Sequence, residues 1–386
     1  MSRIVYLDNA ATSWPKPKNV INAVNDSFIL CGNPGRSGHE LSLYSAKAVY
    51  SCREAICSFF NFSNPENVIF TYNTTYALNL AIKGLMEDEG EIVISNLEHN
   101  SVIRPVKELE KNNEGISVKI FDALCNDETR LSNFENALSD KTRLCVITMC
   151  SNVTGSIMPY RKIGEICRKK GIKLIFDAAQ LAGLCPIDLS SLYFSAVCFA
   201  GHKSLYGIMG SGFCIFSKDV EPKSIIQGGN GTMSISAFQS GDLPERLESG
   251  TVGVPGIIAL REGIKHINNL GISYIGEKCA YLENVLSSRL SEIKNVKIYS
   301  KVQNKVSTVL FNIGGVPSEA AASFLSEKGI CVRSGLHCAP LCHKALGTLE
   351  TGAVRVSISH FNTGEDVEEF LKGVEEILHI QKSSVI

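Results

Sequence analysis

The segment KLIFDAAQ (173–180) is an apolar, β-branched run that ends in a carboxylate and continues through small residues. Other short apolar runs precede it, and amphipathic helical patterns such as TTYALNLAIKGL (74–85) separate them. Nearly continuous apolar strands between helices are typical of a mainly parallel sheet that helices cover on both faces. The sequence therefore predicts an α/β fold. The remaining strand-like runs are NVIFTY (67–72), EIVIS (91–95), SVKIF (117–121), RLCVITM (143–149), AVCFAG (196–201) and GFCIF (212–216), the last two too close together for a crossover helix.

The pattern changes after about residue 255. Two long helical patterns (256–269 and 272–293) lead into shorter strand-like runs and a closing helix that begins near Gly364. This order predicts a second, smaller α+β domain at the C-terminal end. We expect a large domain over 13–255 and a small domain over 256–386, to which residues 1–12 are assigned.

The composition limits the classes of function. The 386 residues are 44% hydrophobic, and 38 Lys and Arg against 39 Asp and Glu leave a net charge of −1 without a basic block, so we expect no nucleic-acid partner. No apolar stretch approaches the roughly 18 residues of a membrane helix, which predicts a soluble cytoplasmic protein with no membrane partner. The fourteen cysteines are scattered and form no C-x-x-C pair, so we expect mostly reduced core thiols.

Asp177 and Lys203 are the most informative pair of polar residues. Asp177 ends one strand-like run, and Lys203 follows the next such run in AGHKSLYG. A pyridoxal phosphate site needs a lysine that forms an imine and a carboxylate that keeps the pyridine nitrogen protonated. Carboxylates at strand ends are common in α/β proteins, so the pair alone leaves a purely structural role open.

Three further segments fit the same chemistry. Thr74 and Thr75 stand between a strand and a helix, where hydroxyl and free N–H groups can hold a phosphate, although an ordinary helix cap is the alternative. The imidazole of His99 could lie flat on a planar cofactor, or it could be a surface or capping residue. The amide of Asn152 could donate to a ring oxygen of the cofactor, or belong to an ordinary turn.

Taken together, these segments resemble the class V aminotransferase-like, fold-type I enzymes that use pyridoxal phosphate, and most closely the cysteine desulfurases. The resemblance covers essentially the whole chain and implies a seven-stranded sheet in the large domain. RSGLHCAP is similar to the reactive-cysteine segment of the group II, Suf-type branch, which includes selenocysteine lyase-like members. The matching segments are DNAAT (8–12), TTYALN (74–79), EHNS (98–101), SNVTG (151–155), DAAQ (177–180), GHK (201–203), ESGT (248–251), RSGLHCAP (333–340) and RVSISHFNT (355–363).

The resemblance implies a role for each matching residue around the cofactor. Lys203 holds pyridoxal phosphate as an imine, Asp177 pairs with the pyridinium nitrogen, and His99 stacks on the ring. Gln180 hydrogen-bonds the phenolic oxygen. The phosphate ligands are Thr75 and His202, joined by Thr251 from the neighbouring subunit, which implies a homodimer.

The resemblance also implies the substrate side of the site. Its residues are Asn152 and Arg355 for the substrate carboxylate, the backbone near Ala10, His39 near the substrate, and Arg333 beside the reactive thiol of Cys338. From the sequence alone, Arg333 and His337 give Cys338 a more cationic neighbourhood than core cysteines have, which favours the reactive thiolate.

The implied activity is a pyridoxal phosphate-dependent cysteine desulfurase. L-Cysteine becomes L-alanine, and its sulfur stays on Cys338 as a persulfide that an acceptor protein can take, the sulfur mobilisation that serves iron–sulfur cluster assembly. Lys203 moves the substrate α-proton. A selenocysteine lyase would use the same site, and the sequence does not separate the two.

Two features depart from the family pattern. Ala200 stands where the family commonly has Ser, so one phosphate hydroxyl is missing. The segment 337–343 offers His337, Cys338, Cys342 and His343, which leaves a thiol-rich metal or redox carrier as a rival from another class. Because Pro340 and the short span hinder tetrahedral convergence, we expect no metal there.

Overall fold

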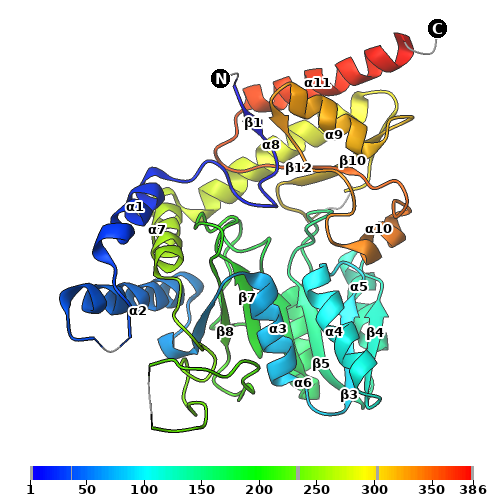
Figure 1. The fold of residues 1–386 in the computed structure, drawn as a ribbon. Helices are drawn as coiled ribbons and strands as arrows, with labels where there is room; N and C mark the ends of the chain where they lie inside the picture. The colour runs from blue at the N-terminus through cyan, green and yellow to red at the C-terminus, as the bar shows by residue number, and fades with distance from the viewer. Residues whose placement is uncertain (1–2, 36, 232–234, 301–303, 384–386) are drawn as a thin grey trace.

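The computed structural model describes residues 3–35, 37–231, 235–300 and 304–383, and Figure 1 shows their arrangement. A seven-stranded sheet lies at the centre of the lower part of this view. All of its neighbouring strands pair in parallel except the second strand in the order, which is antiparallel to both of its neighbours. Across the sheet the order is β2 (Val68–Thr71), β8 (Gly212–Phe216), β7 (Ala196–Ala200), β6 (Lys173–Asp177), β5 (Thr142–Thr148), β3 (Gly90–Ser95) and β4 (Ile116–Phe121).

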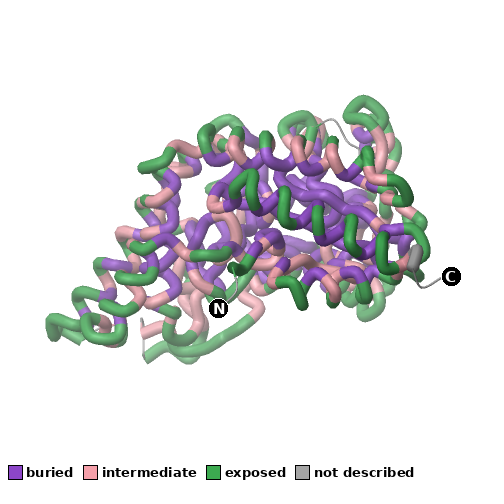
Figure 2. The backbone as a smooth tube through the Cα atoms, turned by 90° about the horizontal axis from the view of Figure 1, so that it is seen from above, coloured by how far each residue is buried: buried purple, intermediate pink, exposed green. Residues whose placement is uncertain are grey.

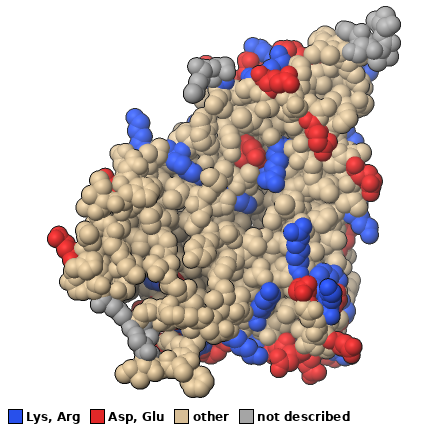
Figure 3. Space-filling model, viewed as in Figure 1, with Lys and Arg blue, Asp and Glu red and all other residues tan. Residues whose placement is uncertain are grey.

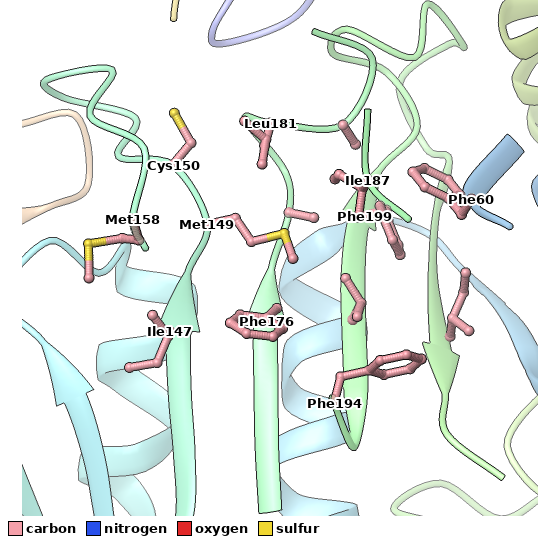
Figure 4. Close-up of a cluster of buried hydrophobic side chains, with 14 of the residues drawn as sticks. Phe60, Ile147, Met149, Cys150, Met158, Phe176, Leu181, Ile187, Phe194 and Phe199 are labelled. Carbon is pink, nitrogen blue, oxygen red and sulfur yellow. The ribbon is translucent and has the colours of Figure 1, made fainter. Parts of the chain in front are cut away.

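Helices cover both faces of this sheet, so its inner strands are largely buried, whereas the edge strand β4 leaves Ser117 and Ile120 exposed. Within β3, Ile92 and Ile94 pack in one core, whereas Val93 between them packs in the other. The first face is covered by α3 (Thr74–Leu85) and α4 (Asn100–Asn112). The opposite face is covered by α2 (Glu40–Phe60), α5 (Asp127–Ala137), α6 (Tyr160–Lys170) and α7 (Val254–Leu270), and α1 (Lys18–Leu30) packs on α7. Figure 4 shows part of this second core, where Ile147, Phe176 and Phe199 come from neighbouring strands.

A second, smaller layer lies above the large sheet in Figure 1. An antiparallel sheet in the order β12 (Val354–Ser357), β10 (Thr308–Ile313), β9 (Val296–Ile298) packs with α8 (Ile272–Glu292), α9 (Ser318–Glu327) and α11 (Gly364–Ser383) around a core of its own. The N-terminal strand β1 (Val5–Tyr6) pairs in parallel with β11 (Ile330–Cys331), and Val5 belongs to this core. The short helix α10 (Pro340–Leu346) lies between the small sheet and the lower part; the 3₁₀ turn η1 (Pro65–Asn67) precedes β2.

The fold class predicted from the sequence is confirmed: the chain is α/β, with a mainly parallel seven-stranded sheet. The close spacing of β7 and β8 produces an antiparallel pair, as a missing crossover requires. The domain division at 255 stays a prediction. Apolar residues of α7 belong to the same core as α2 and α6, and the change to the second core comes within α8, between Cys279 and Leu282.

The surface carries charges of both signs. On the face drawn in Figure 3, basic side chains are scattered among acidic ones and are not gathered into one band. The tube of Figure 2 places the buried stretches in the interior and the exposed residues on the outer turns of the helices. Within the described ranges, no helix is long and apolar enough to cross a membrane.

Candidate active site

Several elements meet at one edge of the large sheet. The strands β5, β6 and β7 are parallel, so Asp177 at the end of β6 and the residues Asn152 and Lys203 that follow β5 and β7 come to the same edge. Because β2 has the same direction as these strands, the helix that begins at Thr74 starts there too. The carboxyl ends of parallel strands are the usual ligand-binding edge of an α/β sheet.

A cleft of about 800 Å³, solvent at its mouth included, opens at this edge. The loop between β11 and β12 and the N-terminal segment complete its walls, so residues from both layers line it. The predicted site residues that line this single cleft are Ala10, Thr74, Thr75, His99, Asn152, Asp177, Gln180, His202, Lys203, Arg333, Cys338 and Arg355.

Two predicted residues, His39 and Thr251, do not line this cleft. His39 is the N-cap of α2, where its Nδ1 accepts a hydrogen bond from the Ser42 amide at 3.3 Å. Thr251 lines two other hollows, beside Glu248. Both residues are exposed on the single chain. Their predicted roles stay predictions.

Lys203 and Asp177 line the same cleft, and the charge of each affects the pKa of the other. Burial lowers the pKa of Lys203 to about 8, against the opposing pull of the Asp177 charge. Burial also raises the pKa of Asp177, although its Oδ1 accepts a hydrogen bond from the Ala179 amide at 2.9 Å. A lysine with a depressed pKa has a larger fraction of free amine, the form that reacts with carbonyl groups.

Hydroxyl and imidazole groups gather at the start of α3 and α4. Asn73 caps α3 through its side chain, so Thr74 and Thr75 are not the cap and their first-turn amides face the cleft edge. The Thr75 Oγ1 lies 2.7 Å from the Ser101 Oγ, which lies 2.8 Å from the His99 Nδ1. His99 is the N-cap of α4, as one interpretation expected, and it also lines the cleft, while its stacking on the cofactor ring stays a prediction. Burial lowers the pKa of His99 to about 4, which keeps the ring neutral.

The peptide that precedes Lys203 is held by the N-terminal segment. The carbonyl oxygen of His202 accepts hydrogen bonds from Thr12 Oγ1 (3.0 Å), Ser13 N (3.1 Å) and Lys16 Nζ (2.8 Å). The His202 ring is neutral because burial lowers its pKa to about 4. Its Nδ1 is buried and has no hydrogen-bond partner within the described part of the chain.

Arg355 of β12 joins the two layers. Its buried guanidinium binds the Asp8 carboxylate at 2.6 Å and donates to the Asn152 carbonyl at 3.1 Å. Among the described residues, nothing partners its Nε, which is buried. Gln180 Nε2 donates to the Ala10 carbonyl at 3.1 Å, so the N-terminal segment contacts both layers.

Cys338 lies on the loop between β11 and α10, and of the fourteen cysteines it alone is exposed. The expectation of a cationic imidazole beside it is wrong, because burial lowers the pKa of His337 to about 2. Arg333 lines the cleft with Cys338 and is the cation that remains. Asn152 Nδ2 donates to the His337 carbonyl at 2.8 Å, so the predicted donor to the cofactor also supports this loop.

The rival interpretation took 337–343 as a metal site, but the side chains of this segment are not arranged as ligands of one metal ion. The two imidazoles lie side by side and bond to each other, with His337 Nδ1 3.1 Å from His343 Nε2. The second nitrogen of His343 lies 2.8 Å from Thr348 Oγ1, and Cys342 is buried. In the part of the chain that the structure describes, no three His, Cys, Asp or Glu side chains are placed to share a metal ion.

Sequence reasoning missed two residues of this site. Ser101 lines the cleft between Thr75 and His99, and it stands within the segment EHNS. Its position in the first turn of a helix, next to a predicted phosphate site, was a usable signal. Asp8 was quoted within DNAAT, but its pairing with Arg355, 347 positions away, had no sequence signal.

A scan against family models matches residues 5–370 to "Aminotransferase class-V". The chain belongs to the class V aminotransferase family. A probable cysteine desulfurase of Methanothermobacter thermautotrophicus is 33% identical over 381 residues, which cover 97% of this chain and 94% of the relative. The apo cysteine desulfurase of Thermococcus onnurineus NA1 superposes with a TM-score of 0.90 at 29% identity, covering 97% of this chain and 94% of the other. The cysteine desulfurase CsdA of Escherichia coli gives a TM-score of 0.88 at 25% identity, with coverages of 98% and 95%.

Class V aminotransferases depend on pyridoxal phosphate, and the cleft fits this group. Lys203 supplies an amine with a depressed pKa near the buried Asp177 carboxyl group. The unpartnered Nδ1 of His202 is a buried polar atom that lacks a ligand. The start of α3 supplies free amides and the Thr75 hydroxyl for a phosphate. The assignment to the group II branch stays a prediction.

Proposed function

We propose that this protein is a cysteine desulfurase that converts L-cysteine into L-alanine and leaves the sulfur on Cys338 as a persulfide. The observation that carries the proposal is the exposed thiol of Cys338 on the same cleft as Lys203 and Asp177. Curated relatives named as probable cysteine desulfurases share about a third of their residues with the chain over nearly its whole length.

Each side chain of the cleft has a part in binding or proton transfer. Bound pyridoxal phosphate supplies an electron sink that lets the substrate lose its Cα proton and weakens the Cβ–S bond. Lys203 Nζ takes the Cα proton, a task for which a pKa near 8 is suited at neutral pH. The Asp177 carboxyl group stabilises the proton on the pyridine nitrogen. Arg355 and Asn152 bind the substrate carboxylate, and His99 covers the ring.

The sulfur transfer balances without an external oxidant. The Cys338 thiolate attacks the sulfur of the substrate, so that an S–S bond forms while the Cβ–S bond breaks. The electron pair of the broken bond stays with the substrate carbon skeleton, which takes up a proton and leaves as alanine. The thiol and cysteine thus become a persulfide and alanine, with every atom retained.

The proposal includes a homodimer whose partner subunit completes each site. His39 and Thr251 are exposed on the single chain and away from its own cleft. A Thr251 hydroxyl from the second subunit would then bind the cofactor phosphate, in the place where Ala200 provides no hydroxyl. Mixing two inactive variants, Lys203→Ala and Thr251→Ala, should restore part of the activity in hybrid dimers; a fully active monomer in light scattering contradicts this arrangement.

The proposed destination of the sulfur is an acceptor protein that serves iron–sulfur cluster assembly. An exposed persulfide at the mouth of a cleft is open to attack by an acceptor thiol. We also propose a cytoplasmic location, because all fourteen cysteines are free, as in proteins of reducing compartments.

A single-turnover experiment tests the function. The cofactor-loaded protein receives one equivalent of L-cysteine, and alanine and the mass gain of one sulfur atom are measured. Trypsin leaves Cys338 and Cys342 on one peptide between Arg333 and Lys344, so fragmentation at the Ala339–Pro340 bond must separate the two thiols. We expect sulfur on Cys338. Sulfur on Cys342 alone, or alanine from selenocysteine but none from cysteine, overturns the proposal.

A further inference from the structure

The helix α10 begins two residues after Cys338 and carries a buried histidine on the far side of the reactive loop. His343 is fully buried and does not line the cleft. The ring planes of His343 and His337 lie 21° from parallel with centroids 5.3 Å apart, the side-by-side arrangement of an in-plane hydrogen bond. His337 is also buried and directly precedes Cys338. His343 therefore contacts the reactive loop without reaching the substrate.

The partners of the two rings determine which ring nitrogen donates a hydrogen bond and which accepts one. The Arg333 carbonyl oxygen can only accept, and it lies 3.3 Å from His337 Nε2, which must carry the proton. His337 Nδ1 is then the acceptor, so His343 Nε2 donates to it at 3.1 Å. His343 Nδ1 in turn accepts from the Thr348 hydroxyl at 2.8 Å. These partners assign one neutral tautomer to each ring.

Neutral rings agree with the surroundings of the pair. Burial lowers the pKa of both histidines, and the nearby Arg355 and Arg333 charges lower that of His337 further. The pair is a fixed support and carries no proton to the thiol.

The backbone that this support holds is in an unfavourable conformation. His337 and Cys338 have φ of +49° and +56°, two consecutive side-chain-bearing residues in the left-handed region. Residues in this region are strained, and they persist only where the surrounding structure imposes the conformation. Two further bonds act on the loop: Asn152 donates to the His337 carbonyl, and the Asn100 amide donates to the Cys338 carbonyl at 2.7 Å. These bonds come from the cofactor side, whereas His343 acts from the opposite side.

We propose that His343 is a positioning residue for Cys338: by donating to His337 from α10, it holds the loop in the left-handed conformation that presents the thiol to the cleft. The inference rests on the proposed function. It assigns to the helix after the reactive cysteine a part in the sulfur transfer step that acts through His337, and none in cofactor or substrate binding.

The test compares variants that keep or remove the donor. His343→Gln places an amide nitrogen where Nε2 stood and keeps the bond to His337, whereas His343→Leu fills a similar volume without a donor. Lys344→Ala, at an exposed position of the same helix, is the matched control. The cofactor-loaded proteins are compared by the single-turnover rate of persulfide formation on Cys338, by the cysteine KM, and by the cofactor absorption spectrum.

We expect His343→Leu to slow persulfide formation roughly 10- to 100-fold, as a misplaced reacting group does, with the KM and the spectrum unchanged. His343→Gln should recover most of the rate, and Lys344→Ala should match the unaltered protein. Selenium release from selenocysteine should fall less in His343→Leu, because a selenol leaves carbon more easily and depends less on the enzyme thiol.

Several outcomes overturn the inference. They are a normal persulfide rate in His343→Leu with only a lower melting temperature, an equal loss in His343→Gln, or a changed KM with a normal transfer rate. If His343→Leu does not fold, Thr348→Val removes the donor to His343 and must slow the transfer step by a smaller factor. If the unaltered protein forms no persulfide on Cys338, the proposed function fails and the inference falls with it, whereas a normal persulfide rate in His343→Leu overturns the inference alone.

Discussion

The two walls of the cleft are built in different ways. On the large sheet, Asp177 and Lys203 follow neighbouring parallel strands, whose ladder hydrogen bonds fix the backbone beneath them. On the small layer, Cys338 lies on a loop with positive φ angles at Gly335, His337 and Cys338, and side chains hold this loop from outside. The sheet edge favours precise cofactor binding, whereas the loop leaves the thiol exposed for sulfur to arrive and depart. Substitutions on the two walls should therefore affect different steps.

We call the wall on the large sheet, with Asp177 and Lys203, the cofactor wall. Lys203→Ala tests this wall and should have the largest effect. Without the amine, covalent cofactor binding and removal of the substrate Cα proton are both lost, so turnover should fall to background. Pyridoxal phosphate should still bind noncovalently through Thr75 and His202 and be lost on dialysis. Alanine assays and absorption spectra measure both effects, with the exposed Lys218→Ala as control. A turnover within tenfold of the unaltered enzyme contradicts the assignment.

We call the wall on the small layer, with the loop that carries Cys338, the thiol wall. Cys338→Ala tests this wall. Alanine formation from cysteine should fall by several orders of magnitude, since removing a nucleophilic serine from a protease costs about 10⁶-fold. The cofactor spectrum and the melting temperature should not change, because the side chain is exposed. Cys125→Ala, a partly exposed thiol outside the cleft, is the matched control. If Cys338→Ala lost its cofactor, the two walls would not be separable.

The same contrast explains what the sequence could predict. Strand ends such as Asp177 and helix starts such as Thr74 follow from local apolar patterns, and the parallel sheet brings them together without further information. The environment of Cys338 could not be read in this way. His337 was expected to be cationic, and its neutrality results from burial under α10 and from a partner six positions away.

Contacts between residues far apart in the chain could not be predicted from the sequence either. The ion pair between Asp8 and Arg355 joins the two ends of the chain, and no periodicity or spacing indicates it. The donors from Thr12, Ser13 and Lys16 to the His202 carbonyl are of the same kind. Motifs located the residues of the site, whereas only the packed layers define which side chain partners which.

Arg355→Lys tests the residue that joins the walls. A planar guanidinium can bind a carboxylate through two parallel hydrogen bonds, which an ammonium group cannot do. We expect the cysteine KM to rise roughly 10- to 100-fold, the equivalent of one or two lost charge-assisted hydrogen bonds. The cofactor spectrum should stay the same. An unchanged KM would leave Arg355 with a structural role only, as the partner of Asp8 and Asn152.

The smallest predicted effect is the change with pH in the rate of cofactor uptake. It shows whether the groups that titrate belong to the cofactor wall or to the thiol wall. Burial lowers the pKa of Lys203 from 10.5 to about 8, so below pH 8 its amine is mostly protonated and cannot react with the aldehyde of pyridoxal phosphate. The rate of cofactor uptake by the apoenzyme should therefore rise about tenfold between pH 7 and pH 9 and level off above the Lys203 pKa. The buried histidines of the thiol wall should add nothing to this profile, because they stay neutral. Cys338→Ala and His343→Gln should reproduce the midpoint. Stopped-flow absorbance provides the measurement: a midpoint near 10 would mean that Lys203 is not desolvated, and a midpoint that moves in His343→Gln would mean that the two walls titrate together.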